Sequence, residues 1–272
     1  MRNLEKVRTL LGVGFLLAVL VFSKSSVLAQ EAGLPLHFFT VHCEPPTAKN
    51  RFFAALTRMV QLADDYSIKL TIEFTPQWAE MILQDKTKLA LVQSWRESGH
   101  EIGAHHHPVQ HRGTWDGYTS RKDMAGDARY RGTMDDFIKL LNELVYPEKI
   151  KTLGSPDEAD WVRGVPYRTE GTEAGGAVGI PVRLTLNGTT VYDIGYGYLG
   201  NKQRLMLLKN KYRTARQDQV FGVVTHAFNY LEDPQLIKAW FEFIKQQDPE
   251  GKRNSTVSEI MEEMAAATAA QE

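Results

Sequence analysis

Two kinds of hydrophobic pattern alternate along most of the chain. Short apolar or alternating segments predict β-strands at 34–42, 69–75, 99–105 and 220–228. Segments with apolar residues three and four positions apart predict helices at about 52–63, 77–97, 127–145, 234–247 and from 255 onward. Strands that alternate with helices at this spacing are typical of a parallel sheet with helical crossovers.

The middle of the chain has a different pattern. Val182, Leu184 and Leu186 alternate with polar residues, and Asn187-Gly188 follows them as a two-residue turn signal. We interpret 181–192 as a β-hairpin inserted into the α/β pattern.

The beginning of the sequence is typical of a secretory signal peptide. Arg2, Lys6 and Arg8 precede an apolar run at 10–22, and small residues follow up to Ala29. The run is short for a membrane span. We therefore expect residues 1–29 to be removed and the protein to be secreted or periplasmic, with no stable membrane insertion. A retained N-terminal anchor is the alternative.

The remaining segment, 30–272, is about 240 residues long, which suits one domain with a sizeable core. The formal net charge of -1 gives no reason to expect a nucleic-acid partner. Cys43 is the only cysteine, so no internal disulfide can form.

Histidines gather where the third predicted strand ends. The segment 99–107 reads Gly-His-Glu-Ile-Gly-Ala-His-His-His, and His111 follows it. Neutral imidazole is the commonest metal ligand, and active sites of parallel folds lie at the carboxyl ends of strands. His105 and His107 would share a strand face, while His107 and His111 have the spacing of one helical turn. These residues are candidate metal ligands, and a histidine-rich surface loop is the alternative.

A second polar group, His42-Cys43-Glu44, ends the first predicted strand. The carboxylate of Glu44 could bind a metal or act as a base, and His42 could do either. Strand alternation places these two on one face while Cys43 points away. A solvated Glu44 and a buried, inert Cys43 are the alternatives.

These motifs resemble those of the polysaccharide deacetylase family, the NodB-homology carbohydrate esterases. Gly99 to His105 reproduces the family's Gly-His-Glu-Ile-Gly-Asn-His strand, with Ala104 in place of the asparagine. Residues 70–75 are similar to its second strand, and 163–167 to its Arg-x-Pro-Tyr segment. Val224-Thr225-His226 resembles the late strand that carries a catalytic histidine.

The resemblance implies an irregular (β/α) barrel of about seven parallel strands, here with the inserted hairpin. It also implies a hydrolase that uses a divalent metal, with zinc expected, to deacetylate an N- or O-acetylated glycan or related acyl substrate. Three positions expected to carry site residues depart from the family. His42 and Cys43 stand where the family has aspartates, and Val109 stands where a second metal histidine is expected.

The expected site is therefore a rearranged one. Its predicted metal ligands are Glu44, His105, His107 and His111. In catalysis, His42 or Glu44 would take a proton from water, His226 would protonate the leaving group, and Arg163 would orient the base. The residues expected to contact the sugar are Trp115, Asp116 and Tyr167. Which of residues 42–44 replaces the family aspartates stays open.

Two other functions fit the same residues. The first is a carbohydrate-binding protein that keeps the barrel but has lost catalysis, as replacement of both aspartates would allow. The second is a metal-binding protein without a substrate. The first predicts sugar affinity without hydrolysis, and the second predicts tight zinc binding without sugar affinity.

Overall fold

The computed structural model describes residues 33–269, apart from 112, 156 and 172–176. The predicted signal peptide at 1–29 lies outside the described residues. None of the helices in the described part is long and apolar enough to cross a membrane.

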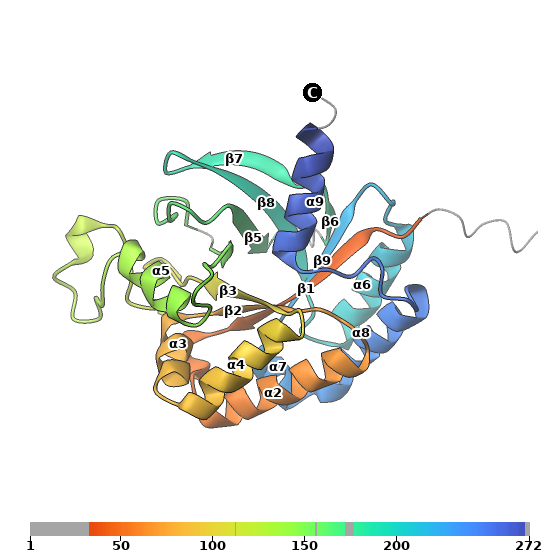
Figure 1. Cartoon of the computed structure of the whole chain (residues 1–272), viewed down its shortest axis with the longest axis horizontal. Coiled ribbons are helices and arrows are strands. Elements are labelled where there is room, and N and C mark those ends of the chain that lie inside the picture. Colours follow the sequence, from red (N-terminus) through yellow and green to blue (C-terminus); the bar gives the residue numbers. More distant parts are fainter. Residues whose placement is uncertain (1–32, 112, 156, 172–176, 270–272) are drawn as a thin grey trace, which may run out of the picture. The chain divides into compact units, whose positions relative to one another are not determined.

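A closed barrel of seven parallel strands forms the centre of the described chain (Figure 1). Each strand pairs with the next, and β8 closes the barrel by pairing with β9 through Gly197 and Val223. This confirms the predicted (β/α) barrel. In barrel order the strands are β9 (Val220–His226), β1 (Leu36–Cys43), β2 (Thr71–Phe74), β3 (Glu101–His105), β4 (Thr152–Gly154), β5 (Tyr167–Gly171) and β8 (Thr189–Tyr198).

The predicted hairpin is present, but only half of it is an insertion. β7 (Val182–Leu186) pairs antiparallel with β8, and Asn187 and Gly188 both have positive φ, as a tight hairpin turn requires. β8, however, continues past the hairpin between β5 and β9 and is a barrel strand. The strands outside the barrel are thus β7 and the short β6 (Val178–Gly179), which pairs antiparallel with β9.

Helices connect the strands and cover the barrel. They are α2 (Asn50–Asp65), α3 (Pro76–Leu83), α4 (Lys86–Glu97), α5 (Met134–Glu143), α6 (Lys202–Thr214), α7 (Ala227–Glu232), α8 (Pro234–Gln247) and α9 (Val257–Ala269), with 3-10 turns η1 (Pro45–Thr47) and η2 (Lys122–Met124).

Local capping explains where the predicted helices were wrong. The helix expected at 77–97 is two helices, because Asp85 accepts hydrogen bonds from the backbone of Thr87 and Lys88 and starts α4. The helix expected from 127 begins only after Thr133, which forms a capping box with Asp136.

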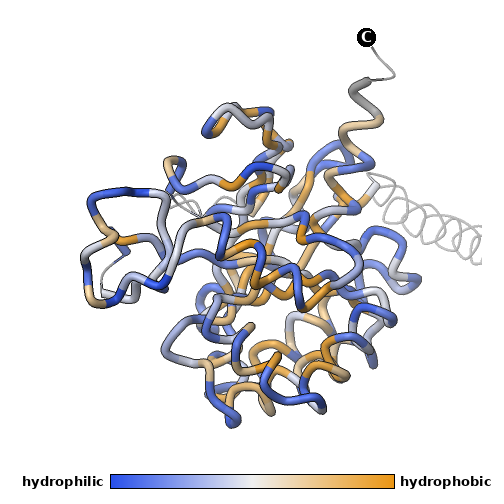
Figure 2. Tube along the Cα trace, turned by 60° about the vertical axis from the view of Figure 1, so that its left-hand side comes forward, coloured by the Kyte–Doolittle hydropathy of each residue, from blue (hydrophilic) through white to orange (hydrophobic). Residues whose placement is uncertain are grey.

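Alternation along β1 sorts its side chains between two cores. Leu36 and Phe38 point into the barrel and pack against α9, which covers that end. Phe39, Val41 and Cys43 point outward into the larger core between strands and helices. Figure 2 shows the hydrophobic stretches concentrated along the strands and along the covering helices. The outward position of Cys43 agrees with the predicted alternation.

The barrel interior changes from apolar to polar along the strands. Beyond Phe38, the inward positions of β1 are Thr40 and His42, both buried. His42 is in register with Glu73 on β2 and with His226 on β9. The parallel register therefore brings three ionisable side chains to one end of the barrel.

The close packing of the barrel interior can be tested at Gly222. A Cβ at this position would lie 2.6 Å from the carbonyl oxygen of Gly195 and would collide with the ring of Phe38. We expect Gly222→Ala to lower the free energy of unfolding in urea by about 1–3 kcal/mol. Gly126→Ala is the matched control, because a Cβ there meets no atom within 4 Å. Equal stabilities for the two variants would contradict this packing.

Candidate metal centre and active site

A cavity of about 300 Å³ opens at the carboxyl ends of the barrel strands. Six histidines, two glutamates and two tyrosines are among its lining residues, which include His42, Glu44, His105, His106, His107, His111, Glu170, Tyr196, Tyr198 and His226. A larger cavity, of about 550 Å³, lies beside Gly99 and Thr256. None of the candidate metal-binding groups found in the described chain includes a residue that lines this larger cavity.

The backbone around Glu44 is fixed on both sides. Its carbonyl oxygen accepts hydrogen bonds from Thr47 Oγ1 at 2.7 Å and from Trp78 Nε1 at 3.0 Å. The carbonyl oxygen of Cys43 accepts one from Thr75 Oγ1 at 2.8 Å. The turn after β1 therefore holds the Glu44 side chain over the cavity.

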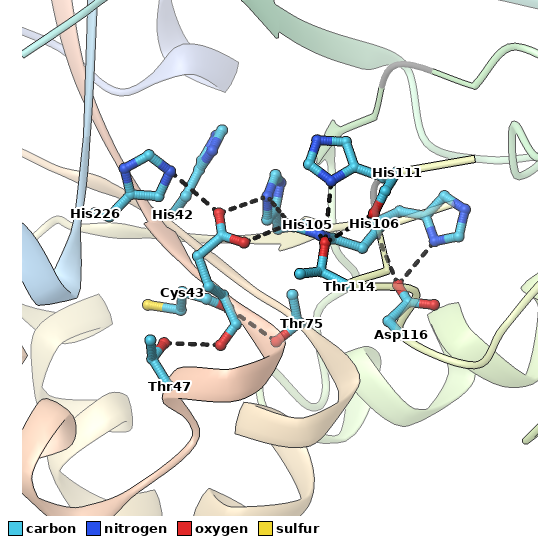
Figure 3. Close-up of polar contacts among 12 residues, drawn as sticks. His42, Cys43, Thr47, Thr75, His105, His106, His111, Thr114, Asp116 and His226 are labelled. Atoms are coloured by element: carbon cyan, nitrogen blue, oxygen red, sulfur yellow. Dashed lines mark hydrogen bonds and ion pairs between the residues drawn. The ribbon is translucent and has the colours of Figure 1, made fainter. Parts of the chain in front are cut away.

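The Glu44 carboxylate faces three imidazoles from two strand ends. Its Oε2 lies 2.6 Å from His107 Nε2, and its Oε1 lies 3.1 Å from His226 Nε2 and 3.4 Å from His105 Nε2. Figure 3 shows His42, His105 and His226 turned toward this centre while Cys43 points away. Glu44 thus forms one polar cluster with histidines that lie about 60 and about 180 positions later in the sequence.

The hydrogen bonds of His107 fix its tautomer. Thr114 Oγ1 donates its single hydroxyl proton to the carbonyl oxygen of His111 at 3.0 Å. It must therefore accept from His107 Nδ1, 2.8 Å away. Nε2 of the same ring then faces Glu44.

His226 is fixed in the same way. Its Nδ1 lies 3.2 Å from Asn229 Oδ1, which also accepts from the backbone of His226 and from the hydroxyl of Tyr198. Because this oxygen can only accept, Nδ1 carries a ring proton, and Nε2 faces Glu44.

Imidazole nitrogens and a carboxylate that converge in this way are a donor group able to hold a metal ion. His107 Nε2 is also 3.0 Å from His105 Nε2. A tetrahedral zinc with bonds of about 2.0–2.1 Å separates its ligand atoms by roughly 3.3 Å. The separations within the group Glu44, His105 and His107 are 2.6, 3.0 and 3.4 Å. The donor chemistry of these residues therefore fits a metal ion, and Glu44 and His107 would have to move apart by several tenths of an ångström to hold one. The contact of His107 Nδ1 with Thr114 would support that ligand from behind.

The electrostatics of the cluster favour metal-binding protonation states. Burial alone would raise the pKa of Glu44, but hydrogen bonds from His105, His107 and His226 bring that pKa well below its usual range. Burial, together with the neighbouring His42, lowers the pKa of His105 to about 3. The cluster therefore contains a carboxylate and a neutral imidazole, which are the forms that bind metals.

Glu73 was not predicted as a site residue. It is fully buried on β2, its Oε2 lies 3.0 Å from His42 Nε2, and Thr169 Oγ1 donates to its Oε1 at 2.8 Å. Burial raises the pKa of Glu73 to about 7, and burial lowers the pKa of His42 well below its usual value. The sequence did offer one signal for Glu73, because it is a carboxylate within a predicted strand of alternating apolar residues.

A second histidine network lies behind the candidate metal ligands. His106 is fully buried, with Nδ1 2.8 Å from Asp116 and Nε2 3.4 Å from Asp160. Asp116 Oδ2 also accepts from the backbone of His107 at 2.9 Å. Burial would lower the pKa of His106, but the two carboxylates raise it to about 9. A charged His106 thus anchors the chain between the two metal-ligand candidates.

Several predicted residues do not lie with this cluster. Arg163 is exposed and does not line the cavity. The predicted sugar contacts Trp115, Asp116 and Tyr167 are buried and do not line it either; Tyr167 packs in the apolar end of the barrel. His111 does line the cavity, and its Nδ1 is 3.1 Å from Thr114 Oγ1.

A scan against protein-family models finds no match, and a search of the curated proteins finds none either. Solved structures do match. A provisionally assigned polysaccharide deacetylase from Mycobacterium smegmatis has a TM-score of 0.57 at 14% identity, with 89% of this chain and 94% of that chain covered. The peptidoglycan deacetylase PdaC from Bacillus subtilis has a TM-score of 0.50 at 12% identity, with 89% and 96% covered.

The same barrel occurs in an enzyme of another kind. A 4-alpha-glucanotransferase from Thermococcus litoralis matches with a TM-score of 0.54 at 11% identity, over 84% of this chain and 40% of that chain. The described chain therefore has the NodB-like barrel fold of the polysaccharide deacetylases, in a divergent form. The fold by itself does not fix the reaction, so function is argued from the site.

The anchor behind the ligands can be tested at Asp116. We expect Asp116→Asn to lower the free energy of unfolding by about 3 kcal/mol, because it leaves a buried imidazolium with one fewer carboxylate. Asp123→Asn removes an exposed carboxylate paired with Arg121 and should change stability little. Urea unfolding of both variants measures the difference, and a mild effect at Asp116 would show that His106 is uncharged in the fold.

Proposed function

We propose that the protein is a secreted, zinc-dependent hydrolase that removes acetyl groups from an acetylated glycan. The observation that carries this proposal is the convergence of Glu44 with His105, His107 and His226 in one cavity of a NodB-like barrel. Glu44 supplies the carboxylate that the first strand of the deacetylase family provides from an aspartate. Secretion is inferred from the signal-peptide pattern at 1–29.

Glu44, His105 and His107 are the proposed zinc ligands. A zinc ion held there would lower the pKa of water and polarise an acetyl carbonyl. The hydrogen bond between His107 Nδ1 and Thr114, and the one that the His107 backbone N–H donates to Asp116, would keep His107 in place when substrate enters.

His226 is the proposed proton carrier. Its Nδ1 is held by Asn229, and its Nε2 lies at the cavity, 3.1 Å from Glu44 Oε1. In hydrolysis, Nε2 would take a proton from water as the water oxygen bonds to the acetyl carbon. The same proton would pass to the leaving nitrogen or oxygen as its bond to that carbon breaks, giving acetate and the deacetylated sugar.

The cavity wall suits a sugar-sized substrate. Tyr196 and Tyr198 line it beside His226, and the ring of Tyr198 lies edge-on to the ring of His226 at 5.2 Å. Aromatic faces and a few polar groups in a cavity of this size are typical of small-molecule sites. Trp115, Asp116 and Tyr167 stay predictions as sugar contacts.

The zinc site can be tested at Glu44. We expect Glu44→Gln to lose the zinc between Glu44 and His107 and to reduce acetate release from N-acetylglucosamine oligomers at least about a hundredfold. Elemental analysis and an acetate assay measure the two effects. Glu242→Gln, on a surface helix where Glu242 pairs with Lys238, should match the parent in both. Retention of zinc and activity by Glu44→Gln would contradict the assignment.

The proton carrier can be tested separately from the metal. We expect His226→Ala to retain zinc but to lower kcat about a hundredfold or more, because the proton transfer loses its carrier. If zinc is lost as well, His226 is a ligand and not the proton carrier. If the parent protein binds acetylated oligomers with zinc present yet releases no acetate, the inactive carbohydrate-binding function replaces the one proposed.

A further inference from the structure

Three buried polar atoms converge just inside the barrel from Glu44. They are His42 Nε2 on β1, Glu73 Oε2 on β2 and His105 Nδ1 on β3, and none of them makes a hydrogen bond to any described residue. Buried polar atoms are nearly always hydrogen-bonded, so three unpaired atoms at one place require an explanation.

The three atoms lie close to one another, and the rings of His42 and His105 are stacked with centroids 3.9 Å apart. His42 Nε2 is 3.0 Å from Glu73 Oε2 without forming a hydrogen bond, and His105 Nδ1 is 4.0 Å from the same oxygen. A ligand atom of each residue lies within 4.8 Å of the other two. Ligands of one zinc ion also lie close together without pointing at each other.

The surroundings hold Glu73 in place, but no described residue donates a hydrogen bond to its Oε2. Thr169 donates only to Oε1, at 2.8 Å. On the other side lies Gly154, where a Cβ would collide with Oε2 and would come within 3.0 Å of His105 Nδ1. Glycine at this position therefore leaves the space beside the two unpaired atoms open.

We propose that His42, Glu73 and His105 form a second, inner metal site for a divalent ion of the zinc type. Two imidazole nitrogens and one carboxylate oxygen are a donor set that suits such an ion. His42, His105, Gly154 and Thr169 all line the cavity, so an ion from solvent reaches the inner site through it.

His105 connects the inner site to the outer one. Its Nε2 faces Glu44 and His107, while its Nδ1 faces Glu73. With both sites filled, His105 binds one ion through each ring nitrogen, after its single ring proton has passed to solvent. The protein would then hold two ions per chain, joined by one imidazolate ring.

The test counts zinc in the full chain after gel filtration into metal-free buffer. We expect two zinc ions per chain in the parent, and one in both Glu73→Gln and Glu44→Gln. Glu170→Gln should keep two, because this cavity carboxylate pairs with Arg168 and belongs to neither group. Far-UV circular dichroism checks that each variant is folded.

A second variant covers the case in which Glu73→Gln does not fold. Thr169→Val keeps the carboxylate but removes the hydrogen bond that positions it, and we expect zinc to bind the inner site at least tenfold more weakly in a chelator competition. Unchanged binding of both ions in Thr169→Val would overturn the inner site.

The outcomes separate this inference from the proposed function. One zinc in the parent that disappears in Glu44→Gln would overturn the inner site and leave the outer site standing. Two ions in Glu73→Gln would overturn the role of Glu73. A parent that binds no zinc would overturn both sites.

Discussion

The central constraint in this structure is the buried Glu44 carboxylate, which faces imidazole nitrogens of His105, His107 and His226. Thr114 contacts Nδ1 of His107 and Asn229 contacts Nδ1 of His226, so both rings turn Nε2 toward a negative charge. A buried carboxylate is stable only when hydrogen bonds or positive charge compensate it. The geometry, the burial and the hydrogen bonds around the cluster are all consistent with a bound cation.

The barrel produces this constraint through simple alternation. Inward positions of parallel strands are apolar near α9 and polar near the carboxyl ends, so the register alone gathers His42, Glu73, His105 and His226. The backbone turn after β1 then adds Glu44, and the buried His106 network anchors the residues after β3. The carboxylate in this cluster comes from Glu44, directly after β1, and not from position 42 or 43 at the end of that strand.

Much of the fold could be predicted from periodicity, because long amphipathic helices and apolar strands leave clear patterns. The strands β4 and β5 and the helix α6 could not. β4 has three residues, and α6 buries only Leu208 and Tyr212 among many charged residues, so neither has a strong hydrophobic period. The hairpin turn was evident from Asn187-Gly188, yet the sequence did not show that its second strand closes the barrel.

The convergence of the candidate residues was predictable where they are close in sequence or end a recognisable strand, as for His105, His107, Glu44 and His226. The partners that decide tautomers and charge, such as Asp160, Asn229 and Glu73, come from distant segments and had no motif. The expected sugar contacts were chosen from residue type alone. Trp115 and Tyr167 are instead buried away from the cavity, which shows that aromatic residues near a motif are as readily used for packing.

X-ray diffraction from crystals grown with zinc, measured on both sides of the zinc absorption edge, tests the cation most directly. The account predicts an anomalous peak within bonding distance of Glu44, His105 Nε2 and His107 Nε2. A map without a peak there, with Glu44 and His107 joined directly by a hydrogen bond, would contradict it.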